Sequence, residues 1–322
     1  SGSRSGTTML ESFVHVGYVG QHGVHQPFRT NDSNIVVPER LPDGSLQWPL
    51  PLKSGKKLNP NVGVINTLLW IGKNDYNALN VGLRRQAGGL RAGVSYTYGK
   101  STDLSSSSTA GSNFNNSIVG PISQFPDVMK GRSDFDVRHN LVLNAVYTLP
   151  SLGAGSGIAK ALTDGWQISG IYKIQSGLPF SAAIGGDSVG MLGANSFNFA
   201  DRLTTPGCES AVNPGDPNHY IKTECFAFPA PGRMGNSGRN SLEGPGIKTL
   251  DASLVKMTRI KGASLQVRLE MFNVLNRANF AVPNRTVSQI FNAAGRLNAN
   301  AGKLISTSTT ARQMQLGAKL SW

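Results

Sequence analysis

The chain has 322 residues, 39% of them hydrophobic and only 15% charged, and its 31 Lys and Arg against 18 Asp and Glu give a net charge of +13. A soluble domain carries about 25% charged residues. Here Gly, Ser, Asn and Thr take their place, which is typical of strands and turns. No apolar run approaches the ~18 residues of a membrane-spanning helix, so a helical membrane protein is excluded.

Three explanations of the positive charge are considered: a nucleic-acid partner, anionic lipid headgroups and a solvated surface. Apart from KSGKK (53–57) the basic residues are scattered singly, and no zinc-finger or helix-turn-helix spacing occurs. We therefore expect no nucleic-acid partner. Anionic lipid headgroups suit scattered surface charge better, and the alternative is a surface that is merely solvated.

Eight segments alternate apolar and polar residues with the period of two that predicts a strand with one apolar face. In chain order they are 11–19, 76–86, 90–99, 141–149, 166–174, 247–257, 264–272 and 313–322. The clearest is LRAGVSYTYG, in which Leu90, Val94 and Tyr96 alternate with Arg91 and Ser95. Each segment is close to the ~9–11 residues with which a tilted strand crosses a bilayer.

The connections between these segments alternate in length. The first, third, fifth and seventh are long, whereas those at 86–89, 150–165 and 258–263 are short. Bacterial outer-membrane barrels have short periplasmic turns and long outside loops, whereas a soluble sandwich has no reason to sort its loops in this way. The pattern predicts an all-β fold, an antiparallel transmembrane β-barrel with about eight strands in this chain and both chain ends on the periplasmic side.

The two faces of each strand would meet different surroundings. The apolar faces would contact lipid, and the sheet must close because no edge can stay unpaired in hydrocarbon. On the polar faces we expect the lumen-lining residues Arg91, Lys173, Arg268, Glu270 and Lys319. Aromatic residues near strand ends suit interfacial girdles, or alternatively a soluble core; they are Tyr96, Tyr98, Tyr147, Trp166, Tyr172 and Trp322.

Two cysteines, Cys208 and Cys225, lie in one stretch rich in Pro, Gly and Asn. A metal site would need further ligands, and His219 is the nearby candidate. A disulfide across a long loop fits better and implies an oxidising compartment. Free thiols are the alternative.

Several other stretches imitate active or metal sites. Asp103, Asp134 and Asp136 could bind calcium, but their spacing lacks the acidic density of a calcium loop, so solvated loop carboxylates or a turn-capping Asp are the favoured interpretation. No nucleophile lies at a recognisable spacing from His139, so we interpret this residue as a polar residue at a strand end. GAGSG (153–157) lacks the Gly-Lys-Ser/Thr ending of a phosphate loop and reads as a flexible turn.

Arg268 and Glu270 lie two residues apart on the proposed lumen face. They are interpreted as a structural charge ladder, with a substrate site as the alternative. We expect no cofactor, no metal and no enzymatic activity.

Several runs, in this order, resemble the C-terminal β-barrel of Oar-like TonB-dependent receptors. They are WIGKNDYNALNVGLRRQ (70–86), SYTYGKSTD (95–103), SDFDVRHNLVLNAVYTLP (133–150), GWQISGIYKIQSGLPF (165–180), GNSGRNSLEGPG (235–246), EMFNVLNRANF (270–280) and ARQMQLGAKLSW (311–322). The resemblance implies a plugged barrel of about 22 strands. Residues 1–322 would be its C-terminal part, with the plug and N-terminal domains absent.

The resemblance also implies a function and partners. The intact protein would be an outer-membrane transporter that takes up a bulky nutrient with energy passed through TonB, which would contact the missing N-terminal part. Outer-membrane lipid and lipopolysaccharide would surround the barrel. Ligand specificity is expected mainly in the long loops 20–75 and 185–246. An adhesion or structural barrel with partner-binding loops is the alternative.

The end of the chain resembles the signal read by the barrel assembly machinery. That signal has a polar residue, a glycine, an apolar residue and a final aromatic residue, matched by Gln315, Gly317, Leu320 and Trp322. Phe is the commoner last residue, so Trp322 departs from the pattern. The resemblance implies that the assembly machinery is a further partner.

Overall fold

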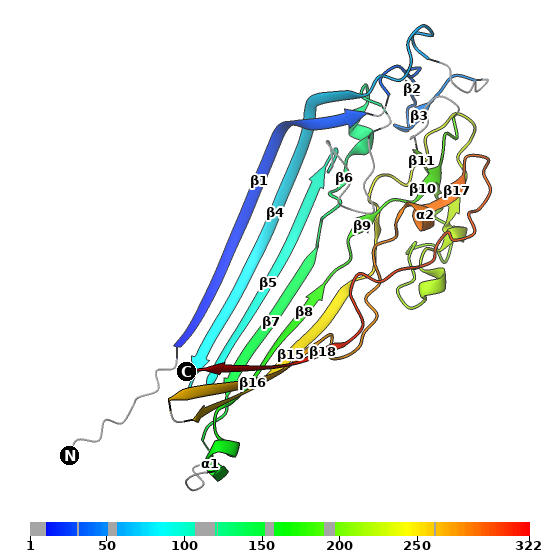
Figure 1. Ribbon diagram of the computed structural model, residues 1–322. Coiled ribbons are helices and arrows are strands. Elements are labelled where there is room, and N and C mark those ends of the chain that lie inside the picture. Colours follow the sequence, from blue (N-terminus) through cyan, green and yellow to red (C-terminus); the bar gives the residue numbers. More distant parts are fainter. Residues whose placement is uncertain are drawn as a thin grey trace.

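A computed structural model describes residues 11–30, 32–50, 57–106, 120, 122–151, 158–189, 197–260 and 262–322. Its main feature is a sheet in which eight long strands run antiparallel in chain order (Figure 1). They are β1 (Glu11–Thr30), β4 (Thr67–Ala87), β5 (Leu90–Asp103), β7 (His139–Thr148), β8 (Trp166–Gln175), β15 (Ile247–Ile260), β16 (Ala263–Phe272) and β18 (Gln313–Ser321). This confirms the predicted fold class and the eight strands.

The two outermost strands of this sheet are β1 and β18. Within the described residues they do not pair with each other, so the sheet is open rather than closed into a barrel. The connections alternate in length as predicted: the short ones are 88–89, 149–165 and 261–262, and the long ones are 31–66, 104–138, 176–246 and 273–312. A short helix, α1 (Ile158–Thr163), lies in the second short connection.

Strand register assigns every residue to one of two faces, since directly paired residues of an antiparallel sheet point the same way. The row that contains Arg91 continues through Val146, Ser169, Ser253, Glu270 and Gln315. We call this the inner face. The opposite or outer face carries the apolar set, such as Leu143, Tyr172 and Leu250, which pair across three strands.

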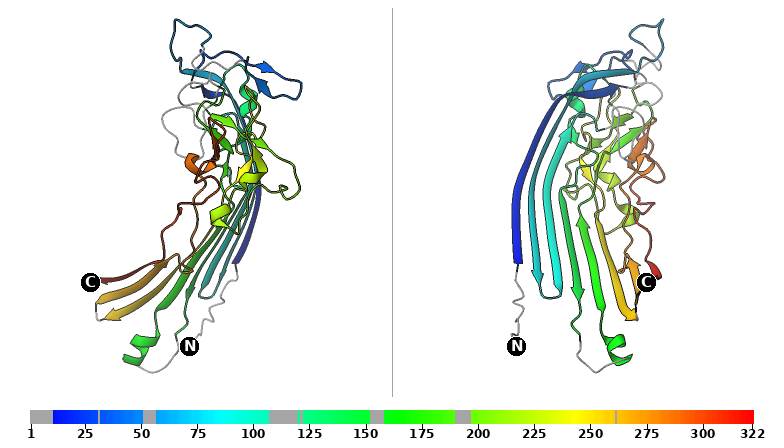
Figure 2. Two further views of the ribbon diagram at one scale, coloured as in Figure 1. Left: turned by 90° about the vertical axis from the view of Figure 1, so that its right-hand side faces the viewer. Right: turned by 60° about the vertical axis from the view of Figure 1, so that its left-hand side comes forward.

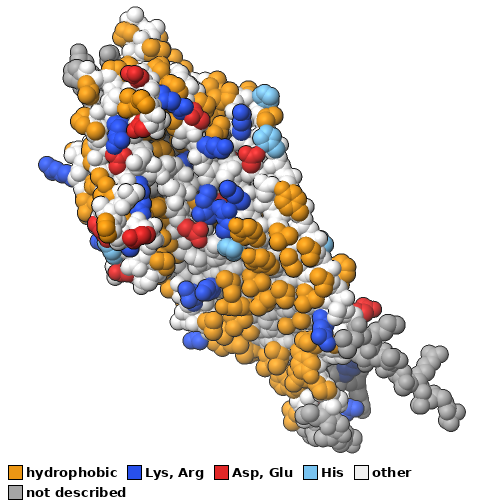
Figure 3. Space-filling view, turned by 180° about the vertical axis from the view of Figure 1, so that it is seen from behind, with side chains coloured by type: hydrophobic (Ala, Val, Ile, Leu, Met, Phe, Trp, Pro, Cys, Tyr) orange, Lys and Arg blue, Asp and Glu red, His pale blue; other side chains and the backbone are white. Residues whose placement is uncertain are grey.

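The apolar outer face is not covered by another layer of the protein. Val16, Tyr18 and Leu316 are exposed to 65%, 71% and 77%. Figure 3 shows this surface as a continuous area of hydrophobic side chains over the lower part of the sheet. An exposed apolar area of this kind marks contact with a partner or a membrane.

The hairpin formed by β1 and β4 is longer than the periodicity predicts. The prediction that residues 20–75 form one long loop is therefore wrong. Strands β1 and β4 pair from Glu11↔Gln86 to Thr30↔Thr67, with register shifts around Gln26. The upper part of β1, QHGVHQPFRT, has no alternation of apolar residues. Pairing with β4 and burial of Phe28 hold it in place instead, and neither can be read from a period of two.

The long connections form what we call the loop assembly, at the end of the sheet away from the start of β1 and the end of β18 and on one side of the sheet (Figure 2). Its elements are β2 (Glu39–Arg40), β3 (Leu46–Gln47), η1 (Pro126–Met129), β6 (Gly131–Arg132), β9 (Pro179–Phe180), β10 (Ala183–Gly185), β11 (Phe197–Phe199), β12 (Asp201–Arg202), η2 (Pro217–His219), η3 (Thr223–Cys225), β13 (Phe226–Ala227), β14 (Leu242–Glu243), α2 (Arg285–Ser288) and β17 (Gln289–Asn292). Of these, β6 pairs with β5 in the main sheet.

The two hydrophobic core clusters of the protein lie in this loop assembly and include Phe28 from the upper end of β1. One cluster joins Phe28, Trp48, Met129 and Phe199, and a second joins Phe180 and other residues with Ile290. Trp48 is fully buried, and its indole Nε1 donates to the Val36 carbonyl at 2.9 Å. No described helix is long and apolar enough to span a membrane.

Candidate functional site

The five predicted lumen-lining residues all lie on the inner face. Lys173 pairs with Val142 and Thr249, Arg268 with Gly317, and Lys319 with Gln266, which places these side chains in the same set of rows as Arg91 and Glu270. This face is mixed rather than purely polar, because the exposed side chains of Ile171 and Met257 belong to it. Whether the face borders a lumen stays a prediction.

Arg268 and Glu270 form a loose pair across 4.0 Å, between Nε and Oε1. The Gln315 amide also donates to Glu270. Gly317, which is paired with Arg268, leaves room for the arginine: a Cβ at this position would lie 3.2 Å from Arg268 Nε. This contact agrees with the interpretation of the two residues as a structural charge ladder, and Arg268 stays about half exposed.

A wide, open cavity of about 950 Å³ lies at the short-turn end near the first strands. Its lining includes two inner-face arginines, Arg84 and Arg91, together with Phe13 and Asn144. Gly93 lies opposite Asn144, and a Cβ there would lie 2.3 Å from the Asn144 Oδ1 atom. Arg84 could not be singled out from the sequence, because its neighbour Arg85 interrupts the alternation of β4.

The loop assembly is anchored to the top of β5 by a fully buried arginine, Arg239. Its guanidinium forms ion pairs with Asp103 and Asp134, and its Nε donates to the Met129 carbonyl at 2.8 Å. Asn240, in the left-handed region at φ +53°, donates its side-chain amide to the Asp134 carboxylate at 2.7 Å. The run GNSGRNSLEGPG thus ties the third long connection to the second.

The aspartates of SDFD are not solvated, so that interpretation of Asp134 and Asp136 is wrong. Both are buried, as is Asp103. Asp136 accepts from Arg132 Nε at 2.7 Å and from the Ser101 backbone amide on β5 at 2.6 Å, so it links two segments rather than capping its own turn. Since arginines occupy these carboxylates, they are not free to ligate a cation. No group of three or more candidate ligands occurs among the described residues.

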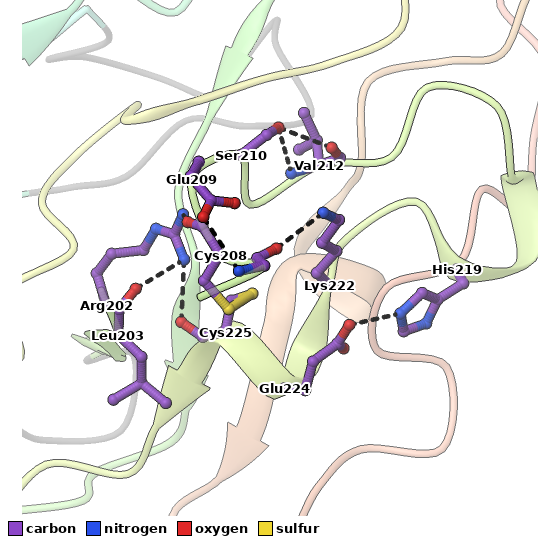
Figure 4. Close-up of a disulfide and its surroundings, with 11 residues drawn as sticks. Arg202, Leu203, Cys208, Glu209, Ser210, Val212, His219, Lys222, Glu224 and Cys225 are labelled. Atoms are coloured by element: carbon purple, nitrogen blue, oxygen red, sulfur yellow. Dashed lines mark hydrogen bonds and ion pairs between the residues drawn. A yellow bond between two sulfur atoms is a disulfide. The ribbon is translucent and has the colours of Figure 1, made fainter. Parts of the chain in front are cut away.

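A second anchor is the disulfide between Cys208 and Cys225, whose Cα atoms are 5.4 Å apart (Figure 4). The Arg202 side chain binds the backbone on both sides of this disulfide: its guanidinium donates to the Cys208 carbonyl and, at 3.2 Å, to the Cys225 carbonyl. The His219 ring points toward Glu224, and its Nε2 lies 3.1 Å from the Glu224 Oε1 atom (Figure 4). The disulfide and the hydrogen bonds from Arg202 therefore stabilise this cross-linked loop.

The first long connection is held by Asp32, which is 2% exposed. Its carboxylate accepts from the backbone amides of Asn34 and Ile65 at 2.9 and 3.0 Å, and it forms an ion pair with Lys57. Burial alone would raise the pKa of Asp32. The Lys57 ammonium and the two amides outweigh it and hold this pKa below its ordinary value of 3.8.

His139 lies at the upper end of β7 and is exposed. Its Nδ1 atom is 2.8 Å from the Tyr96 hydroxyl, and its ring centroid is 5.1 Å from that of Tyr98. The described surroundings are aromatic, and the backbone amide of His139 donates to the Ser176 hydroxyl. The expected role as a polar residue at a strand end agrees with this position. The GAGSG run lies outside the described residues.

The terminal motif lies on and just beyond the outermost strand. Gln315 and Gly317 are on the inner face of β18, Leu320 is on the outer face, and Trp322 follows the strand with 93% exposure. Within the described residues β18 pairs with β16 alone, so its other edge is open to a further strand. Recognition by the assembly machinery stays a prediction.

The comparisons with known proteins agree with this architecture. The model of a family described as the outer membrane beta barrel domain matches residues 10–315, almost the whole chain. No curated protein and no solved structure matches. The exposed apolar face therefore meets the lipid of the outer membrane, in which the protein resides. The chain belongs to the outer-membrane β-barrel domain family.

Proposed function

We propose that the chain forms part of the wall and the outside loops of a TonB-dependent receptor of the Oar-like type, which takes up a bulky nutrient. The observation that carries the proposal is the loop assembly folded beside an open sheet (Figure 2). An eight-stranded barrel has an interior that its own side chains just fill, whereas plugged transporters have about 22 strands. A loop assembly with its own hydrophobic cores suits the wider ring of such a transporter.

The open edges of β1 and β18 support the same proposal. In hydrocarbon an unpaired backbone group costs several kcal/mol, so both edges need partner strands. Further strands of a larger barrel would supply them. The inner-face charges Arg91, Lys173, Arg268, Glu270 and Lys319 would then line a water-filled lumen beside the plug.

Uptake can be tested in cells that carry or lack the intact gene, each with and without TonB. Both pairs are fed a labelled mixture of peptides and oligosaccharides, and the depletion of each compound is followed. We expect at least one compound whose uptake requires the gene and TonB together and stops with a protonophore. Equal depletion in all strains would overturn the proposal.

The adhesion or structural barrel is the second candidate, favoured by the size of the loop assembly. It predicts that loss of the gene lowers binding of cells to surfaces or to each other while uptake is unchanged. The reading frame upstream of the Ser1 codon separates the two candidates, because a plug domain there supports transport.

We also propose that the chain has no catalytic activity. The intact protein should hydrolyse neither lipids nor peptides. An activity that disappears in the His139→Ala variant would contradict this proposal, because His139 and Tyr96 form an exposed titratable pair at the upper ends of β7 and β5.

A further inference from the structure

Two neighbouring rows of inner-face residues form the cavity at the short-turn end of the sheet. Each row crosses β1, β4, β5 and β7, and the strand register pairs its members directly. The first row consists of Glu11, Gln86, Arg91 and Val146, and the second row consists of Phe13, Arg84, Gly93 and Asn144. All of these residues line the same cavity of about 950 Å³, so they belong to one site.

Two arginines of this cavity lie side by side without a counter-ion. Because Arg84 pairs with Gly93 and Arg91 pairs with Gln86, the two arginines are diagonal neighbours on β4 and β5. Residues in this relation are about 7–8 Å apart, within reach of long side chains. Both arginines are exposed, and neither forms a hydrogen bond or an ion pair with another described residue. Two adjacent positive charges of this kind favour the binding of an anion.

Gly93 leaves a space between Arg84 and Asn144, with which it pairs on its two sides. A Cβ at this position would lie 2.3 Å from the Asn144 Oδ1 atom. The Asn144 side chain, like the two arginines, has no hydrogen bond within the described part of the chain. Its amide can donate to an acceptor oxygen, as both guanidiniums can. Three donor side chains therefore border one space.

The lining includes one carboxylate, that of Glu11 on the outermost strand β1. It shares a row with Arg91 but lies two strands away, which corresponds to about 9–10 Å between the backbones. Glu11 forms no ion pair with any residue that the structure describes. A third arginine, Arg85, also borders the cavity, but its position in the register belongs to the outer face. The inner face of the cavity thus carries a net positive charge.

Phe13 gives the cavity an apolar side. Its ring is 63% exposed although it lies on the inner face, and it pairs directly with Arg84. Small-molecule sites have volumes of about 300–1,000 Å³ and combine apolar side chains with a few polar groups that fix the ligand. The volume and the lining of this cavity agree with both properties.

We propose that the cavity binds a small carboxylic acid with an aromatic body. The guanidiniums of Arg84 and Arg91 would hold the carboxylate, because the planar fork of an arginine matches two carboxylate oxygens. Asn144 would donate to the same group, and Phe13 would pack against the aromatic body. The proposal concerns binding alone and is independent of TonB-dependent uptake.

Binding can be measured on the intact protein in phosphatidylcholine nanodiscs by isothermal titration calorimetry, with benzoate as the probe and empty nanodiscs as the reference. We expect one benzoate per chain. Benzamide has nearly the same shape but no charge, so its Kd should be at least about ten-fold higher.

The test variant is Arg84→Gln/Arg91→Gln. A hydrogen bond to a charged group contributes about ten-fold or more in affinity. We therefore expect the Kd for benzoate to rise by about a hundred-fold in the double variant and by about ten-fold in each single variant. Phe13→Ala keeps both charges and should raise the Kd by about five-fold, because the aromatic contact is lost.

The control variant Arg277→Gln/Arg285→Gln removes the same charge from two exposed arginines of the loop assembly and should bind benzoate as the wild type does. Heat-dependent electrophoretic mobility checks that each barrel is folded. If the double variant of the cavity does not fold, the single variants and the comparison of benzoate with benzamide still test the proposal.

Four results would overturn the proposal, whatever the uptake experiment gives. The wild type could fail to bind benzoate, or it could bind benzamide equally well. The double variant of the cavity could keep the wild-type affinity, or the loop-assembly control could lose affinity to the same extent. Inorganic phosphate at a concentration equal to that of benzoate should not displace it, and displacement would instead indicate a site for any anion.

Discussion

The sheet and the loop assembly solve the problem of burying apolar surface in opposite ways. The sheet is a single layer whose apolar outer face has no protein against it, so that Tyr18 and Leu316 remain more than two-thirds exposed. The loop assembly has little regular structure, yet it fully buries Trp48, Phe180 and Ile290.

The difference follows from the solvent around each region. Strands in lipid satisfy every backbone group through neighbouring strands and leave side chains to the hydrocarbon. Loops in water must bury their apolar residues and pair their buried charges, as a soluble domain does. Four predictions use this contrast, in order of decreasing expected effect.

The largest effect is expected from Arg239→Met. Removing one partner of a buried ion pair leaves Asp103 and Asp134 without their arginine, which costs about 3–5 kcal/mol. Hydrogen exchange of the loop assembly should speed up by more than a hundred-fold while the strands below stay protected. The exposed Arg277 offers the control Arg277→Met, which should change little. Equal exchange in both variants would show that the anchor contributes nothing.

The second prediction separates the two faces of one strand. Leu143→Arg puts a charge on the lipid-facing side and should destabilise the folded protein in vesicles by about 2–4 kcal/mol. Asn144→Arg puts the same charge on the inner face and should cost much less. Urea titrations of both proteins test the assignment, and a larger loss for Asn144→Arg would reverse the faces.

The third prediction concerns the cross-linked loop. Cys208→Ser/Cys225→Ser removes a disulfide between cysteines 17 residues apart. This disulfide stabilises the folded loop by about 2–3 kcal/mol, because it restricts the unfolded chain. Limited proteolysis should then cut between the two positions at least ten times faster, with the sheet intact. A cleavage rate equal to that of the wild type would mean that Arg202 and the surrounding core hold the loop alone.

The smallest effect is expected from acid on the first long connection. Because the folded-state pKa of Asp32 is lowered, its ion pair with Lys57 contributes fully above pH 3.8 and is lost as the pH falls through the folded value. Hydrogen exchange in 57–65, corrected for its intrinsic rate, should rise there by about ten-fold. Asp32→Asn should abolish this pH dependence. The control variant is Arg40→Gln, which removes an exposed ion pair with Asp127. This variant should leave the hydrogen exchange unchanged.

The sheet could be predicted from the sequence because each strand needs only local information. A period of two, as in Leu90, Val94 and Tyr96, is imposed by the two media on either side of the strand. It fails where that contrast ends. The upper part of β1 stands in water among loops, and no alternation marks it.

The contacts of the loop assembly could not be predicted in the same way. Arg239 meets Asp103 across 136 residues, and no spacing in the sequence relates them. The pairing of the two cysteines is the one loop contact that the sequence predicts, because the chain contains no other cysteines. The inner-face rows needed the strand register, which turn lengths fix only once the strands are known.

The composition of the two loop cores bears on the order in which the protein folds. The cluster around Phe28 includes Leu104 from the second long connection and Phe199 from the third, and the other cluster joins Phe180 to Ile290 from the fourth. Such distant contacts are slow to form, because the closure of large loops precedes any gain. The membrane-embedded strands supply that closure by bringing the loop ends together. We therefore expect the cores of the loop assembly to form after the long strands have paired.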